Sequence, residues 1–231
     1  MKKSISYFLF IMVVFGACAG YAHGLKSENN HSEPGNNAKG VRLPYINNQT
    51  LTNKKNNIRI CKFLRLKCWQ QETETDRIIG NNGIVYSKKH YRFWFETNQT
   101  CYIYIFNKGT SGRFFPLLPN TMIRTMNRIK PDETNCIPNK EKKGFVLDSN
   151  TGKEKILIIA SVKKLASLEK TAEKLENHQI STREFSKIIK AEKSNISVKD
   201  YMTEPDKPAI AESASTGENA AILMELVYVH K

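Results

Sequence analysis

The sequence lacks the short motifs of the common enzyme classes. It has no Gly-x-Ser-x-Gly elbow, no His-Glu-x-x-His helix, no phosphate-cradling glycine loop and no pair of carboxylates placed near a histidine. These motifs position a nucleophile, a zinc ion, a phosphate group and an acid-base pair, so their absence argues against the usual forms of that chemistry. We therefore expect neither an enzyme nor a bound cofactor.

Residues that bind transition metals are few and dispersed. A structural zinc site needs four ligands at short, regular spacings. No Cys-x-x-Cys occurs, and the five histidines stand singly, among them His31, His90, His178 and His230. The sequence therefore predicts no metal site.

The sequence has no apolar run suited to a membrane-spanning helix, which needs about 20 apolar residues. The run from Ile5 to Ala17 is shorter, follows Lys2 and Lys3, and ends in small residues. A positive start, an apolar middle and a small-residue end are typical of a secretory signal peptide. We expect residues 1–22 to be a removable signal and the remainder to be exported by a bacterial cell.

The end of this signal permits two outcomes. Gly16-Ala17-Cys18 is similar to the end of a bacterial lipoprotein signal, in which Cys18 would be lipidated. Ala17-Cys18-Ala19 and Gly20-Tyr21-Ala22 instead offer small residues to an ordinary signal peptidase. The protein is accordingly expected in the periplasm or outside the cell, or on a membrane if Cys18 is lipidated.

Four cysteines remain after the signal, and an oxidising compartment would permit two disulfides between them. They are Cys61, Cys68, Cys101 and Cys136. A Cys61–Cys68 bond is the least attractive pairing, because these residues lie in one predicted strand. Seven residues at about 3.3 Å each separate them by roughly 20 Å, which is beyond disulfide reach.

Long acidic segments are absent, and the formal net charge is +14. A basic surface favours polyanions such as anionic lipid, polysaccharide or nucleic acid. The lysines occur in short groups beside polar residues, at positions 54–55, 140–143 and 163–164. Groups of this kind are typical of a solvated face, so we expect the charge to serve solubility more than recognition.

Residues 23–57 have few large apolar side chains and four Asn-Asn pairs. Such a segment cannot bury enough surface to order itself. We expect a disordered tether with a root-mean-square span of roughly 30 to 35 Å. Residues 58–231 then form the folded domain.

The folded part is dominated by short strand patterns separated by turn residues. These stretches are rich in Ile, Val, Tyr, Phe and Leu, as strands require. They are Ile58 to Leu66, Gly83 to Glu96, Cys101 to Asn107, Gly144 to Asp148, Glu154 to Ser161 and Ala220 to Val229. The pattern predicts a mainly β fold with an α appendage, specifically an antiparallel β-sandwich.

A lysine-rich helical insertion is predicted over residues 162–194. Apolar residues recur there at three- and four-residue steps, which places them on one stripe of a helix. They are Val162, Leu165, Leu168, Ala172 and Leu175. Ser181-Thr-Arg-Glu184 is a capping box that starts a second helix ahead of Phe185. We expect one or two helices to pack on the sheet rather than on a membrane.

The strand block resembles a bacterial exported family, domain of unknown function 4384, over roughly residues 58–165. The shared order is Tyr102 to Asn107, a turn ending at Gly112, Leu117 to Asn120, Ile137-Pro138, Gly144 to Leu147, Gly152 to Glu154 and Ile158 to Ser161. The resemblance implies a β-sandwich in an exported protein, without established catalytic residues. The four cysteines and the helical insertion depart from the family pattern.

Aromatic residues in the strand block suggest a binding surface. Exposed together, they would form a platform for a peptide or glycan. They are Trp94, Tyr102, Tyr104, Phe114 and Phe115. The alternative is that they fill the core, which is the commoner role of aromatics in strands.

The function expected from these features is a noncatalytic envelope or secreted interaction domain that binds a protein, peptide or glycan. One alternative is an envelope hydrolase that uses Ser161 and Lys164, which have the Ser-x-x-Lys spacing but lack the accompanying Ser-Asp-Asn and Lys-Thr-Gly elements. A second alternative is a basic polyanion-binding protein. Nucleic acid is not the expected partner, because arginines and aromatics are scarcely interleaved.

Overall fold

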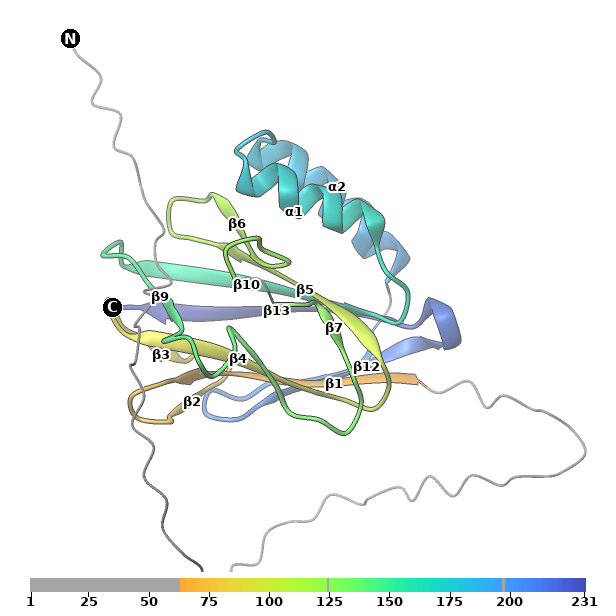
Figure 1. Ribbon diagram of the computed structural model, residues 1–231, viewed down its shortest axis with the longest axis horizontal. Coiled ribbons are helices and arrows are strands. Elements are labelled where there is room, and N and C mark those ends of the chain that lie inside the picture. The colour runs from red at the N-terminus through yellow and green to blue at the C-terminus, as the bar shows by residue number, and fades with distance from the viewer. Residues whose placement is uncertain (1–62, 124, 197) are drawn as a thin grey trace, which may run out of the picture. The chain divides into compact units, whose positions relative to one another are not determined.

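A computed structural model describes residues 63–123, 125–196 and 198–231. The predicted signal (1–22), the predicted tether (23–57), Cys18 and Cys61 lie outside the described residues. Figure 1 shows the described residues as three layers, in which two β-sheets face each other and a pair of helices covers one of them.

The first sheet, called sheet A, contains seven strands of the described chain in the order β11-β12-β1-β4-β8, with β2 paired to β1 and β9 paired to β4. All of its pairings are antiparallel. The strands are β1 (Phe63–Glu72), β2 (Ile78–Ile79), β4 (His90–Thr97), β8 (Asn135–Ile137), β9 (Phe145–Val146), β11 (Val198–Met202) and β12 (Ala209–Thr216).

The second sheet, sheet B, contains six described strands in the order β3-β13-β10-β5-β6, with β7 paired to β5. Its pairings are antiparallel except for the short parallel pair β3–β13. The strands are β3 (Ile84–Val85), β5 (Cys101–Lys108), β6 (Phe114–Leu118), β7 (Arg128–Ile129), β10 (Gly152–Ser161) and β13 (Ala221–His230).

The two sheets differ in how they are buried. Strands β1 and β4 of sheet A alternate strictly between buried and partly exposed residues. Strand β5 and the second half of β10, in the middle of sheet B, are instead buried on both faces. Because successive side chains of a strand point to opposite faces, sheet B must be covered on both sides, whereas sheet A is covered on one.

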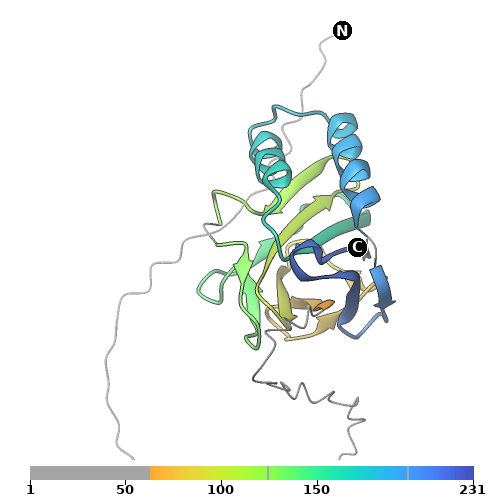
Figure 2. The same ribbon diagram turned by 90° about the vertical axis from the view of Figure 1, so that its right-hand side faces the viewer.

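The helices supply the second cover of sheet B. Helix α1 (Ala166–Glu176) and helix α2 (Thr182–Asn195) lie together on its outer face, as Figure 2 shows from the side. A short 3₁₀ turn, η1 (Gly217–Asn219), precedes β13. An outer apolar cluster joins the helices to the sheet and consists of Tyr104, Phe106, Leu157, Ile159, Leu168, Ala172, Leu175 and Phe185.

Local chemistry fixes where each helix begins. The Ser181 hydroxyl accepts a hydrogen bond from the Glu184 backbone N–H, and the Glu184 carboxylate accepts one from the Ser181 N–H, which is the predicted capping box. At the start of α1, the Leu165 N–H donates to the buried Tyr104 hydroxyl at 2.8 Å. A side chain of sheet B thus satisfies an amide that the helix itself leaves unpaired.

The predicted fold class is confirmed, because the described chain is mainly β with two helices appended from its C-terminal half. The helices occupy 166–176 and 182–195, close to the predicted insertion at 162–194. No helix among the described residues has the length and apolar character needed to span a membrane. Strand β12 was not predicted, because its sequence Ala-Ile-Ala-Glu-Ser-Ala-Ser-Thr is poor in strand-forming residues.

Phe185 should be the main anchor of α2. It is fully buried, and its ring centroid lies 4.9 Å from that of Phe106 and 4.4 Å from that of Phe114. We expect Phe185→Ala to lower the free energy of unfolding by about 3–5 kcal/mol, because it removes a large core side chain and leaves a cavity. Lys187→Ala on the exposed side of the same helix is the control. Equal stabilities of the two variants in urea denaturation would contradict this packing.

Candidate functional site

The outer face of sheet A carries a pair of tryptophans on its two central strands. Trp69 of β1 and Trp94 of β4 lie directly opposite each other in the sheet register. Their rings are parallel to within 6°, with centroids 6.1 Å apart. Both alternate with core residues and are themselves only partly buried, so they point away from the core. We call them the tryptophan pair.

Cationic side chains surround the tryptophan pair. The Lys67 ammonium lies 5.1 Å from the centroid of the Trp69 ring, and the Lys140 ammonium lies 5.1 Å from that of Trp94. Such cation–π contacts place positive charge beside the aromatic surface. Arg92, two residues before Trp94 on the same face, donates hydrogen bonds to the carbonyls of Lys140 and Lys142. This arrangement ties the loop after β8 to the tryptophan pair.

The charge around the tryptophan pair is only partly compensated. Lys67 forms an ion pair with Glu96 at 3.0 Å, but no carboxylate among the described residues pairs with Arg92 or Lys140. The indole N–H of Trp94 is buried and has no hydrogen-bond partner in the described part of the chain. A buried donor without a partner costs free energy. The site therefore presents two uncompensated cations and an unused donor beside a large apolar surface.

Cys136 lies at the edge of this site. It is opposite Trp94 in the β4–β8 register, and it is half-buried. Burial raises the pKa of its thiol, while the charges of Arg92 and Lys140 act in the opposite direction. Of the three described cysteines, Cys136 is therefore the one that lies on the outer face of sheet A.

The predicted disulfides are not observed among the described cysteines. Cys68, Cys101 and Cys136 are free thiols, and Cys61 lies outside the described residues. Cys68 and Cys101 point into the core between the sheets. Cys136 is on the opposite face of sheet A from Cys68, because its register partner Trp94 alternates with the buried Phe93 and Phe95. The prediction of disulfides rested on the even number of cysteines and did not consider which way each cysteine side chain points.

The five aromatics predicted as one platform lie on different surfaces. Tyr104 is fully buried beneath the helices, and Phe114 packs there against Phe185. Tyr102 packs against the same outer cluster, and Phe115 is partly buried on β6. Only Trp94 lies on the outer face of sheet A. The alternative interpretation, that these aromatic side chains fill the core, holds for Tyr104 and Phe114.

Tyr104 shows how deeply this part of the predicted platform is enclosed. Burial raises the pKa of its hydroxyl well above the usual value, although the hydrogen bond from the Leu165 N–H acts to lower it. The hydroxyl is thus engaged in starting α1. A ligand could reach it only if the helices moved away from sheet B.

The predicted Ser161–Lys164 pair does not form a site. Ser161 is 2% exposed and ends strand β10, where it pairs with Tyr102 and Ala221. Lys164 is exposed, and its ammonium lies 3.8 Å from the Glu169 carboxylate. A buried serine whose proposed base points to solvent cannot reach a substrate, so the geometry gives the hydrolase alternative no support.

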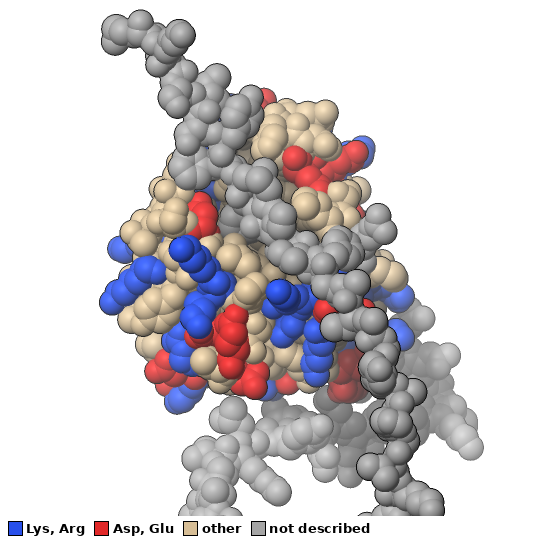
Figure 3. All heavy atoms as spheres, turned by 60° about the vertical axis from the view of Figure 1, so that its left-hand side comes forward, with Lys and Arg blue, Asp and Glu red and all other residues tan. Residues whose placement is uncertain are grey.

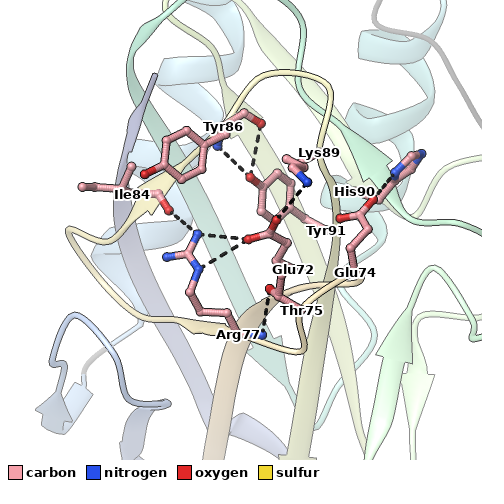
Figure 4. Close-up of polar contacts among 9 residues, drawn as sticks. All are labelled: Glu72, Glu74, Thr75, Arg77, Ile84, Tyr86, Lys89, His90 and Tyr91. Atoms are coloured by element: carbon pink, nitrogen blue, oxygen red, sulfur yellow. Dashed lines mark hydrogen bonds and ion pairs between the residues drawn. The ribbon is translucent and has the colours of Figure 1, made fainter.

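A second polar region lies where β1 ends and β4 begins (Figure 4). The Glu72 carboxylate is buried and accepts from the Arg77 guanidinium at 3.2 Å, and the Lys89 ammonium lies 3.7 Å away. Arg77 also donates to the Ile84 carbonyl. The buried carboxylate thus joins β1 to Arg77, which directly precedes β2, and to Lys89 of the β3–β4 turn.

The same region contains a histidine–carboxylate pair. The His90 Nδ1 and a Glu74 carboxylate oxygen are 2.7 Å apart. Partial burial acts to raise the pKa of Glu74, but the hydrogen bond and charge of His90 outweigh it and the pKa is lowered. Each residue drawn in Figure 4 has a hydrogen bond or ion pair with another residue of the network. We interpret this network as structural.

Charges of both signs are interleaved on the face of the molecule drawn in Figure 3. Lysine and arginine side chains lie beside aspartate and glutamate side chains rather than forming a patch of one sign. Mixed surfaces of this kind attract polyanions weakly compared with a continuous basic stripe. The net charge of +14 therefore does not by itself define a binding surface on this face.

Trp69 and Lys67 were not among the sequence-predicted site residues. The strand containing them was predicted to end near Cys68, whereas β1 continues to Glu72. Alternation of Arg65, Lys67 and Trp69 with buried Leu64, Leu66 and Cys68 was the available signal. Their position opposite Trp94 depends on the β1–β4 register, which the sequence alone does not specify.

Residues 89–164 match the family model described as Domain of unknown function (DUF4384). The match begins just before β4 and ends just after β10, so it includes Trp94 but not Trp69 or either helix. It confirms the resemblance over a shorter segment than the predicted 58–165, and the description names no activity. Searches of curated proteins and of solved structures each found no match to the chain.

The three described cysteines should differ in reactivity. Burial raises the pKa of Cys101 to about 12 and that of Cys68 further, so almost no thiolate forms at neutral pH, whereas Cys136 is half-buried. We expect iodoacetamide to alkylate Cys136 first in the native protein, with Cys68 and Cys101 reacting only after unfolding, as followed by peptide mass spectrometry. Absence of alkylation at all three in the unfolded, unreduced protein would instead indicate disulfides.

Proposed function

We propose that the protein is an interaction domain that binds a protein partner through the outer face of sheet A, at the tryptophan pair. The observation that carries this proposal is the asymmetry of the sandwich. Helices cover the outer face of sheet B, while the outer face of sheet A presents Trp69, Trp94 and their cations without a covering element among the described residues.

The residue types at this site are those that dominate binding energy in protein interfaces. Tryptophan and arginine are enriched at hot spots, where a few well-packed residues account for most of the affinity. Trp69, Trp94 and Arg92 lie together on adjacent strands, and Lys67 and Lys140 border them. A rigid sheet holds these side chains in place, so little side-chain freedom is lost on binding.

The positive charge of the site indicates that its partner carries negative charge. Arg92 and Lys140 have no carboxylate partner among the described residues, and the Trp94 indole N–H is unused. An acidic protein segment could supply carboxylates to these cations. Charge complementarity of this kind increases the rate and the specificity of association. A protein with a carboxylate-rich surface is therefore the proposed partner, in preference to a glycan.

The proposed setting is the bacterial envelope or the exterior of the cell. It is supported by the sequence pattern of residues 1–22, in which a positive start precedes an apolar run and small residues. A lipid on Cys18 would add membrane anchoring, and ordinary cleavage would release the domain. The proposed binding face is the same in both cases.

Substitution of the tryptophan pair tests the proposal. We expect Trp94→Ala and Trp69→Ala each to weaken binding by roughly 30-fold, as for a hot-spot residue worth about 2 kcal/mol. Partners crosslinked to the tagged protein in intact cells would be identified by mass spectrometry. Their capture should fall in both variants while the urea denaturation midpoint shows that each remains folded.

Met126→Ala is the matched control, because Met126 is 76% exposed on the loop between β6 and β7 of sheet B. It should capture the same partners as the unmodified protein. Partners retained equally by all the variants would contradict the proposed face. Capture that is blocked by free oligosaccharide but not by an acidic peptide would favour a glycan instead.

A further inference from the structure

A serine, a histidine and a glutamate from distant parts of the chain meet at one end of the sandwich. Ser87 lies on the turn between β3 and β4, Glu154 lies near the start of β10, and His230 ends β13. The Ser87 Oγ is 2.9 Å from the His230 Nε2, and the His230 Nδ1 is 3.7 Å from a Glu154 carboxylate oxygen. The imidazole therefore lies between a hydroxyl and a carboxylate.

Burial makes this group unusual. The His230 side chain is fully buried and that of Glu154 is 6% exposed, whereas Ser87 is half-buried on a surface turn. The His230 Nδ1 and the Glu154 Oε2 are buried without a hydrogen-bond partner among the described residues. Buried polar groups are nearly always paired, because leaving one unpaired costs free energy. Two neighbouring buried atoms without a hydrogen-bond partner, one from the histidine and one from the glutamate, therefore require an explanation beyond packing.

Neighbouring backbone groups hold the outer members of the set in place. The Thr110 N–H donates to the Glu154 carboxylate at 3.3 Å. The Ser87 N–H donates to the Lys231 carbonyl at 3.0 Å, which fixes the serine beside the end of β13. The Ser87 hydroxyl thus lies at the accessible end of the set and the carboxylate at its enclosed end.

This order of groups is that of an activated serine. A base within about 2.6–3.2 Å of a hydroxyl can accept its proton, and a carboxylate on the other ring nitrogen orients the base and stabilises its cation. The Ser87–His230 distance meets the first condition. The His230–Glu154 distance is longer than a hydrogen bond, as catalytic contacts often are before a substrate binds.

We propose that Ser87 is a nucleophile that hydrolyses small carboxylic esters, with His230 as its general base and Glu154 as a positioning residue. As the bond from the Ser87 Oγ to the ester carbonyl carbon forms, the hydroxyl proton passes to the His230 Nε2 and the carbonyl π electrons move to oxygen. Collapse of this adduct expels the alcohol, which takes the proton from His230, and leaves an acyl-serine.

Water completes the reaction. It attacks the acyl-serine, gives a proton to His230, and releases a carboxylic acid while the Ser87 hydroxyl is restored. The net change is ester plus water to acid plus alcohol. A small acyl group is the proposed substrate feature, because the Ser87 Oγ also lies 3.5 Å from the Lys231 carbonyl, which limits the space around it.

This activity is independent of the proposed binding function. Ser87, His230 and Glu154 lie on the β3–β4 turn and in sheet B, whereas the tryptophan pair lies on β1 and β4 of sheet A. Failure of one proposal leaves the other unaffected. The partner-capture experiment does not involve Ser87, and the experiment below does not involve a partner.

Active-serine labelling tests the inference on the full chain. A fluorophosphonate probe should form a covalent adduct at Ser87, located by peptide mass spectrometry, and p-nitrophenyl acetate should be hydrolysed above the buffer rate. Ser87→Ala should abolish both signals. Ser149→Ala, at an exposed serine, is the matched control and should retain both.

Variants of the other two residues separate their roles. His230→Gln should slow hydrolysis by about 10²- to 10⁴-fold, the usual contribution of a general base. Glu154→Gln should lower kcat with little change in KM, because the imidazolium that forms in the transition state loses the adjacent carboxylate that orients and stabilises it. A purely structural role for Glu154 would leave both kcat and KM of the folded variant unchanged.

The comparison of the unmodified protein with Ser87→Ala tests the inference even if the variants at the buried His230 and Glu154 fail to fold. Absence of probe labelling in the unmodified protein, or labelling that persists in Ser87→Ala, would overturn the inference. In that event Ser87, His230 and Glu154 would only connect the last strand to the β3–β4 turn.

Discussion

Burial of both faces of sheet B is the constraint on which the rest of the structure depends. Strands β5 and β10 carry apolar side chains on both faces, so one face closes on sheet A and the other requires a separate cover. Helices α1 and α2 provide that cover, with Phe185 between Phe106 and Phe114. The hydrophobic effect thus determines where the helices lie and keeps the aromatics of β5 away from solvent.

This constraint also determines which surface is available for recognition. With the inner faces packed together and the outer face of sheet B covered, the outer face of sheet A is the remaining sheet face of the described chain (Figure 1). The fold places the stacked indoles of Trp69 and Trp94 there, with uncompensated cations beside them. A separate polar set at the end of the sandwich contains the buried His230 and Glu154.

Sequence patterns predicted the parts of the fold that local chemistry decides. Alternation identified the strands around Trp94 and Tyr104, and the Ser181–Glu184 capping box located the start of α2. Strand β12 was missed because alanine and serine carry little strand preference, so only its pairing with β1 makes it a strand. Strand register and topology bring together residues that are far apart in the chain. The contacts of Trp69 with Trp94 and of Ser87 with His230 depend on them, so the sequence patterns did not reveal these contacts.

We propose that a partner occupies the outer face of sheet A in the cells that produce the protein. Trp69 and Trp94 are the only tryptophans in the sequence, so indole oxidation reports on this site alone. Hydroxyl-radical footprinting would compare the purified protein with the protein in intact producing cells, with exposed Met122 and Met126 as internal references. We expect both tryptophans to be protected in cells, while the two methionines react equally in both samples. Equal oxidation of the tryptophans in the two samples would contradict it.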